Sequence, residues 1–164
     1  MFTSNVDGHF EKAGFATERI AECHGSIHFL QCLDGCHDGI WPADDFQPAL
    51  DEEHCLLTSE FPLCPRCHGI ARPNILMFGD WGWLAERSDA QEARLHAWRR
   101  QVDRLLVIEV GAGTNIPTAR LMGERMNGPL IRINPTQAQV ADDKNVAVAA
   151  GALAALRSIA ASLV

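Results

Sequence analysis

The sequence has no excess of positive charge and no long, uninterrupted hydrophobic run. Lysine and arginine number 14 against 21 aspartate and glutamate residues, which gives a formal net charge of −7. Nucleic acids and anionic membrane surfaces attract basic fields, so this balance argues against both as partners. Apolar residues make up 47% of the 164, the composition of a folded domain with a core of its own.

A signal peptide and a membrane span are both unexpected. The opening MFTSNVDGHFEK has no basic segment followed by an apolar one. The longest apolar stretch, residues 146–164, carries Arg157 in its middle, and a charge there costs roughly 2.5–3.5 kcal/mol on insertion scales. We therefore predict that this stretch is a buried helix lying on a sheet, with Asp142 and Asp143 capping it.

The sequence contains six cysteines. In a chain without an export signal, cysteines indicate metal binding or a thiol role rather than disulfides. A cytoplasmic location is therefore expected.

The second half of the chain predicts one strand–helix–strand unit. The run Leu105–Val110 is continuous and β-branched, which is typical of a parallel strand buried on both faces. A glycine-rich turn, a helix over Thr118–Asn127 and a strand at Leu130–Ile133 follow it. Upstream, Ser88–Gln91 has the pattern of a capping box, which predicts a helix from there to about Asp103.

Cysteine spacing predicts a zinc site. Cys32 and Cys36 form one close pair and Cys64 and Cys67 another, and two such turns facing each other make a tetrahedral thiolate cage. Four thiolates leave no open coordination position, so the metal would be structural. The first pair is one residue longer than the commonest spacing, and four nearby residues are candidate substitutes for a ligand: His37, His54, Cys55 and His68.

The loop EVGAGTNIP, residues 109–117, follows the predicted strand and precedes the predicted helix, the context of a nucleotide-binding loop. It lacks the third glycine of the common dinucleotide fingerprint, so alone it is a weak signal. His24, in the turn His24-Gly25-Ser26, is by itself more typical of a structural hydrogen bonder than of a base. Cys23 beside it is expected to be a small buried apolar residue.

Taken in order, these segments resemble the sirtuins, the NAD-dependent protein-lysine deacylases. TSNVDGHFEKAG resembles the family's TQNIDGLHERAG, and ECHGSIHFLQC its E-x-HGS segment with the catalytic histidine. The cysteine pairs match its zinc module, RPNILMFGD its RPxxVxFGE, VGAGTNIP its VGTSLxVxP, and IRIN its final IN. The variant FGDWGW is associated with a bacterial branch of the family.

The resemblance implies roles for individual residues. His24 would be the general base that draws a proton from the nicotinamide ribose after the acyl oxygen has displaced nicotinamide, a role suited to a residue type that titrates near neutral pH. Leu76–Gly79 (Leu76, Met77, Phe78 and Gly79) would pair as a strand with the substrate peptide, and Phe78 would wall the acyl-lysine tunnel. The implied NAD contacts are Ser4, Asn5 and Asp7 around the nicotinamide, and Gly111, Ala112, Gly113 and Asn134 around the adenosine half.

The resemblance also implies the architecture: an α/β fold with a partial Rossmann-like parallel sheet, helices on both faces and a small zinc-binding insertion. Residues 1–31 and 68–164 would be the C-terminal portion of the NAD-binding domain, and residues 32–67 the zinc module. The family's GAGxSxxSGIPDFR loop, which holds the NAD phosphates, would precede Met1. We therefore expect that the chain alone lacks neighbours for the apolar faces of Leu105–Val110 and of the last helix, and that it has little or no activity.

The sequence departs from the family pattern at several positions. Ser4 stands where the family has glutamine, and Ala112-Gly113 replaces a threonine–serine pair. Trp81 and Trp83 are unusual just beyond the substrate segment and could alter acyl or peptide preference.

Three functions are compatible with the sequence: deacylation of acyl-lysine proteins, NAD hydrolysis or ADP-ribosyl transfer on the same site, and a zinc-stapled module without catalysis. Zn²⁺ and NAD are the expected cofactors. The oligomeric state is left open.

Overall fold

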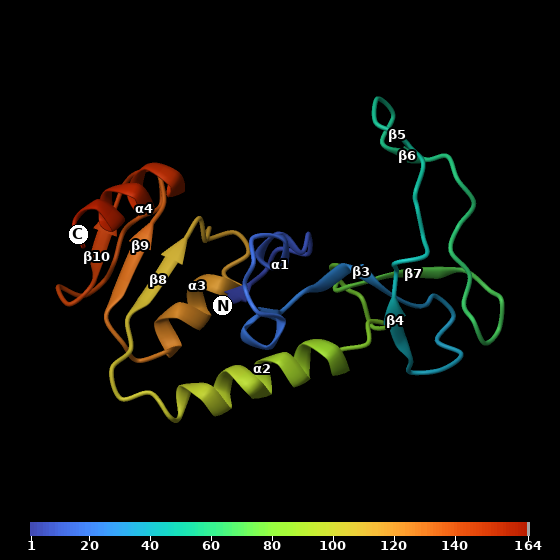
Figure 1. Ribbon diagram of the computed structural model, residues 1–164, viewed down its shortest axis with the longest axis horizontal. Helices are drawn as coiled ribbons and strands as arrows, with labels where there is room; N and C mark the ends of the chain where they lie inside the picture. Colours follow the sequence, from blue (N-terminus) through green and yellow to red (C-terminus); the bar gives the residue numbers. More distant parts are fainter. Residues whose placement is uncertain (164) are drawn as a thin grey trace. The chain divides into compact units, whose positions relative to one another are not determined.

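The computed structural model describes residues 1–163 and divides into two compact units, one spanning Met1–Arg99 and the other beginning at Arg100 (Figure 1). The first unit contains β1 (Phe2–Thr3), α1 (His9–Lys12), a 3₁₀ turn (Thr17–Arg19), β2 (Ala21–Glu22), β3 (Gly25–Cys32), β4 (Ile40–Pro42), β5 (Leu50–Asp51), β6 (Leu56–Leu57), β7 (Ala71–Ile75) and α2 (Glu86–Arg99). The second contains β8 (Val107–Val110), α3 (Thr118–Arg125), β9 (Leu130–Ile133), β10 (Val146–Val148) and α4 (Ala152–Ala161).

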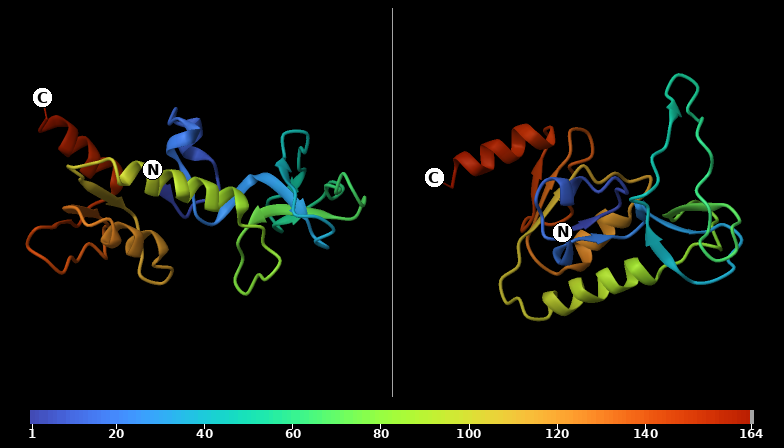
Figure 2. Two further views of the ribbon diagram at one scale, coloured as in Figure 1. Left: turned by 90° about the horizontal axis from the view of Figure 1, so that it is seen from below. Right: turned by 45° about the vertical axis from the view of Figure 1, so that its right-hand side comes forward.

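The second unit contains the predicted strand–helix–strand arrangement. Its sheet has the order β10-β9-β8, and both pairs are parallel, with Val107 opposite Leu130 and Val146 opposite Ile131. Helices α3 and α4 lie on opposite sides of this sheet (Figure 2). The predicted partial parallel sheet with helices on both faces is therefore confirmed.

The prediction of one helix over residues 146–164 is wrong. Val146–Val148 is a strand beside β9, and the helix starts only after Gly151. Asp142 does not cap that helix, because its carboxylate accepts from the backbone N–H of Lys144 in the turn before β10. The Val-Ala-Val segment is compatible with a strand and finds its partner in β9, and Gly151, a weak helix former, separates it from the alanine-rich remainder.

Apolar side chains of the second unit are more exposed than the sequence predicted. In β8 only Glu109 is buried, while Ile108 is 45% and Val110 43% exposed, so the expected burial on both faces is wrong for this chain. Leu153 of α4 is 64% exposed, and Ala155 is the buried residue of that helix. Within the described residues, no helix combines the length and apolarity needed to cross a membrane.

In the first unit, β3 is the central strand of an antiparallel sheet with the order β4-β3-β7, while β1 and β2 form a separate parallel pair. Strands β5 and β6 form a small hairpin on a long loop that stands away from the three-stranded sheet (Figures 1 and 2). The predicted insertion, residues 32–67, lies entirely within this unit.

Helix α2 begins two residues before the predicted capping box and ends at Arg99 rather than Asp103. Ser88 and Gln91 do not cap it. Both are buried and bind the backbone of Glu22 in β2: the Ser88 hydroxyl donates to the Glu22 carbonyl at 2.8 Å, and the Gln91 amide oxygen accepts from the Glu22 N–H at 3.0 Å. These two polar side chains therefore attach α2 to the strand that leads into the His24 turn.

A buried ion pair supports the sheet of the second unit. The Arg132 guanidinium contacts both carboxylate oxygens of Glu109, at 2.5 and 2.9 Å, and one of Glu124 at 2.9 Å. The Arg132 and Glu109 side chains are only 3% and 5% exposed. Because the two residues are opposite each other in β9 and β8, the pair joins the two strands on one face.

We predict that Arg132→Leu destabilises the chain by about 3–5 kcal/mol, because it leaves Glu109 buried without a partner. The double variant with Glu109→Leu removes both charges and should recover most of that loss. Urea unfolding followed by circular dichroism measures both. A double variant as unstable as the single one would contradict the assignment of the loss to an unpaired charge.

Candidate functional site

His24 lies in the two-residue turn between β2 and β3, and Gly25 fixes the position of that turn. Gly25 has φ +80°, and a Cβ on it would lie 1.9 Å from the carbonyl oxygen of Asn74 in β7. Only glycine permits both the left-handed backbone and this close approach. The half-buried His24 is therefore held directly against the end of β7.

The predicted peptide-binding segment follows β7. The Leu76 N–H donates to the His24 carbonyl at 3.0 Å, so histidine and segment are linked through the backbone. Strand β7 ends at Ile75, and Leu76–Gly79 is not a strand in this structure: the Asp80 N–H closes a turn onto the Met77 carbonyl at 3.2 Å, with Gly79 at φ +68°. The segment is therefore an exposed turn that continues from β7.

The turn after this segment is anchored at three residues, Asp80, Gly82 and Leu84. Arg72 of β7 pairs with Asp80 at 2.7 Å, and this hydrogen bond is the main cause that lowers the pKa of the Asp80 carboxyl. Gln31 of β3, fully buried, donates to the Gly82 carbonyl at 2.7 Å. Asn74, also fully buried, donates to Gln31 at 2.8 Å and to the Leu84 carbonyl at 2.9 Å.

Sequence reasoning missed Gln31 and Asn74. Their only sequence signal is a polar residue inside an otherwise apolar strand, and nothing in the spacing shows that the two side chains meet.

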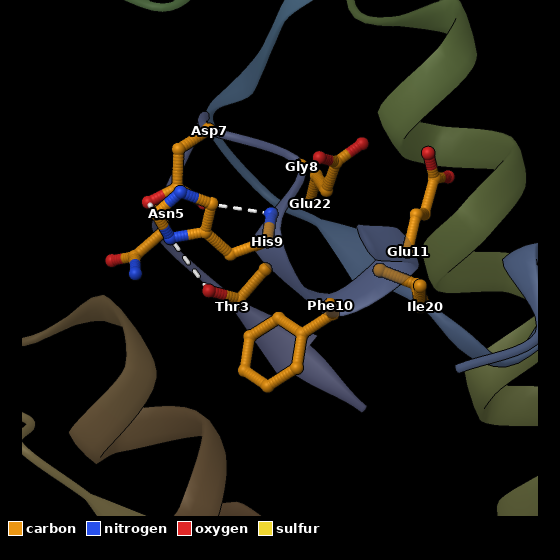
Figure 3. Close-up of a pocket in the computed structure, with 9 residues that line it drawn as sticks. All are labelled: Thr3, Asn5, Asp7, Gly8, His9, Phe10, Glu11, Ile20 and Glu22. Carbon is orange, nitrogen blue, oxygen red and sulfur yellow. Dashed lines mark hydrogen bonds and ion pairs between the residues drawn. The ribbon is translucent and has the colours of Figure 1, made fainter. Parts of the chain in front are cut away.

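The residues implied for the nicotinamide side lie around a small pocket beside α1. Figure 3 shows Asn5 and Asp7 on one wall, with Thr3, His9 and Phe10 near them. The Thr3 hydroxyl accepts from the Asn5 N–H at 3.0 Å, and the Asp7 carboxylate accepts from the His9 N–H at 3.0 Å. His28 Nε2 lies 3.2 Å from the Asp7 carbonyl, which is hydrogen-bonding distance. Ser4, which lies between Thr3 and Asn5 in the sequence, is half-buried.

The four predicted cysteines come together. The sulfurs of Cys32, Cys36, Cys64 and Cys67 all lie within 4.8 Å of one another. The Cys32–Cys67 sulfur distance is 3.7 Å and the Cys36–Cys64 distance 3.6 Å. Tetrahedral zinc with bonds of about 2.3 Å separates its sulfur ligands by about 3.8 Å. The cluster is therefore compatible with zinc.

Among the described residues, none of the four alternative ligands, His37, His54, Cys55 and His68, belongs to the cluster. His37 Nε2 is 3.4 Å from the Cys64 sulfur, which is hydrogen-bonding distance. His54 pairs with Asp51 at 2.8 Å in the β5–β6 hairpin, where the Cys55 thiol donates to the Glu52 carbonyl. The geometry thus selects the four cysteines.

The cysteines differ in their tendency to ionise. Burial opposes the Cys64 thiolate, but backbone N–H groups from Cys67 and Arg66, together with His37, stabilise it, and its pKa is lowered to about 6. Burial, followed by hydrogen bonds with the neighbouring thiols, raises the pKa of Cys36. Like charges this close cannot all form without a cation among them, which is the situation that a divalent metal resolves.

Cys23 lies outside the cluster. It is 7% exposed, and burial followed by the charge of Glu92 raises the pKa of its thiol to about 12. The predicted role as a small buried apolar residue is confirmed.

In the second unit, the loop Gly111–Gly113 leaves the carboxyl end of β8 with Gly111 at φ +70°. The Ala112 carbonyl accepts from Asn134 Nδ2 and from Arg120, both at 3.3 Å. The Asn134 side-chain oxygen accepts from the N–H of Thr136 and of Gln137. Asn134 therefore shapes the loop, a role that its place in the motif did not reveal.

Three comparisons identify relatives. The family model described as "Sir2 family" matches residues 1–114. The "Probable bifunctional ADP-ribose hydrolase/ADP-ribosyltransferase" of Fusarium oxysporum f. sp. cubense is 32% identical over 126 residues, covering 70% of this chain and 21% of its own length. The "NAD-dependent protein deacylase" of Corynebacterium glutamicum is 27% identical over 159 residues, covering 94% of this chain and 56% of its own length.

Among solved structures, "Sir2-p53 peptide-NAD+" superposes with a TM-score of 0.62 at 21% identity, covering 98% of this chain and 61% of that one. At this identity the likeness shows a shared fold. The chain spans less than two thirds of the length of each of these relatives.

We predict that Gly25→Ala unfolds or strongly destabilises the first unit, because a methyl group would overlap the Asn74 carbonyl. Gly14→Ala is the matched control: Gly14 has φ +87°, but a Cβ there meets nothing within 4 Å. The control should lose only the backbone cost of about 1–2 kcal/mol. Equal losses in urea unfolding would show that the close approach at Gly25 does not matter.

Proposed function

The chain belongs to the Sir2 family, whose model matches residues 1–114, and on this premise we propose that it carries the catalytic part of an NAD-dependent protein-lysine deacylase. The observation that carries the proposal is the backbone link from Leu76 to His24. It supports the proposal because His24, the candidate base, and the segment that would hold the acyl-lysine are then neighbours along the backbone. A base has to lie within hydrogen-bond reach of the proton it takes.

The substrate would bind as an added strand along Leu76–Gly79. The outward backbone groups there would pair with the peptide on either side of the acyl-lysine, which gives affinity with little dependence on sequence. Phe78 is 90% exposed, as expected of a side chain that contacts a ligand rather than a core. Such binding would hold the acyl group beside His24.

NAD fits the residues present. A Cβ on Gly111 would meet nothing within 4 Å, so the backbone in front of this loop is open to a ligand. Gly111, Ala112, Gly113 and Asn134 would contact the adenosine half, and Ser4, Asn5 and Asp7 the nicotinamide half. NAD supplies the ribose carbon that takes the acyl group as nicotinamide leaves. His24 would accept the ribose hydroxyl proton, and the Gly25 turn would hold its ring in place.

Zinc would be structural. Four cysteine thiolates close the coordination sphere, so no position remains for substrate or water. Cys32 belongs to β3, whereas Cys64 and Cys67 lie on the turn that leads into β7. The metal would therefore hold the ends of the two strands that carry the His24 turn and the peptide segment. We propose residues 32–67 as the zinc module and residues 1–31 and 68–164 as the NAD-binding portion.

A second candidate is NAD hydrolysis or ADP-ribosyl transfer. The Fusarium relative, whose name includes ADP-ribosyltransferase, shares 32% identity. The two functions separate by product, because deacylation yields O-acyl-ADP-ribose and hydrolysis yields free ADP-ribose.

We predict that His24→Ala lowers NAD-dependent deacetylation of an acetyl-lysine peptide by about 10²–10⁴-fold, the range for a lost general base. The assay uses the chain alone and with a supplied N-terminal segment of a Sir2 protein, since the chain spans 61% of the solved relative. His96→Ala, an exposed histidine on α2, is the matched control and should keep full activity. Absence of activity in every combination, with zinc still bound, would favour a non-catalytic zinc module.

We predict one zinc per chain by elemental analysis, and its loss in Cys36→Ser and Cys64→Ser. The first unit should then lose thermal stability, since metal binding contributes directly to folding. Cys55→Ser, on the exposed hairpin, is the control and should keep its zinc. Full zinc occupancy in either cluster variant would contradict the four-cysteine assignment.

A further inference from the structure

Trp81 is an almost fully exposed aromatic ring just after the proposed peptide segment. Its side chain is 98% exposed, and Phe78 and Met77 before it are 90% and 59% exposed. Exposed large apolar groups gathered in a few consecutive residues are typical of a contact surface. Met77 and Phe78 belong to the proposed peptide segment, and Trp81 lies two residues beyond its last residue, Gly79.

The backbone that carries Trp81 is held on both sides. Asp80 before it pairs with Arg72 at 2.7 Å and accepts from the Gly82 N–H at 3.1 Å. Gly82 after it accepts from the buried Gln31 at 2.7 Å. The ring is therefore presented from an ordered turn, and a ligand that contacts it pays little for ordering the backbone.

The charge of the first unit shows which ligand suits this ring. Residues 1–99 contain seven lysines and arginines against sixteen aspartates and glutamates, a formal charge of −9, whereas residues 100–164 carry seven against five, or +2. Not one lysine or arginine occurs from residue 20 to residue 65. The basic residues on either side of Trp81 in the sequence, Arg72 and Arg87, are each paired with a carboxylate.

An exposed indole on a unit of net negative charge favours a cationic side chain, because the ring face attracts cations and the net field of the unit concentrates them. We propose that Trp81 is a specificity-determining residue that receives a lysine or arginine of the substrate peptide beside the acyl-lysine. This inference rests on the proposed function, because it takes the peptide to lie along Leu76–Gly79. An aromatic or aliphatic substrate residue beside the acyl-lysine would gain binding energy from contact with the ring but none from the negative charge of the unit.

The test is direct binding of two fluorescent acetyl-lysine peptides to the 164-residue chain, read by anisotropy. One peptide has arginine on both sides of the acetyl-lysine, and the other has citrulline, which keeps the shape and removes the charge. The wild-type chain should bind the arginine peptide about three- to tenfold more tightly. Trp81→Ala should lose most of this preference, and Trp81→Phe should keep part of it. Added salt should weaken the preference.

Trp98→Ala is the matched control, since Trp98 is also exposed, at 51%, but lies near the end of α2. It should keep the wild-type preference. Equal binding of both peptides by the wild-type chain, or a preference that survives in Trp81→Ala, would overturn the inference and leave the proposed function standing. Failure of the chain to bind acetylated peptides more tightly than unacetylated ones would overturn the peptide-binding proposal and this inference with it.

Discussion

The close approach of the His24–Gly25 turn to the end of β7 is the contact on which the candidate site depends. The Asn74 carbonyl occupies the space where any other residue at position 25 would place its Cβ. This contact brings β3 and β7 together at the point where the Leu76 N–H reaches the His24 carbonyl. One steric constraint therefore positions the candidate base and the start of the peptide segment at once.

The buried polar side chains of the first unit extend this contact outward. Gln31 and Asn74 lie on the paired strands β3 and β7 and bind the backbone of Gly82 and Leu84. These hydrogen bonds attach the turn after the peptide segment to the sheet. A buried amide that loses its hydrogen-bond partner finds no water to replace it, so such a network favours one loop conformation. At the other end of the same strands, the cysteine cluster joins β3 to the turn before β7. The sheet is thus secured at both ends, and the site lies at the end away from the cysteines.

In the second unit, polar side chains likewise connect separate elements, and here the buried pair is charged. Arg132 and Glu109 link β9 to β8 on one face, while Asn134 and Arg120 hold the Ala112 carbonyl at the carboxyl end of β8. Polar side chains therefore organise the strand and the loop after it. In both units, the loops with proposed ligand contacts are shaped by side chains from other elements.

Local pattern determined much of this protein. The cysteine pairs, the glycine of the His24 turn, strand β9 and the strand–helix–strand unit were all readable, since each depends on neighbouring residues or on residue type alone. Tertiary structure decided the rest. Ser88 and Gln91 have the spacing of a helix cap, but in the structure β2 lies beside them and their side chains form hydrogen bonds with the Glu22 backbone. Val146–Val148 looked like part of a helix until the free edge of β9 offered it strand pairing. Propensity and spacing act within a few residues, whereas the partner that satisfies a buried polar group comes from wherever the fold places it.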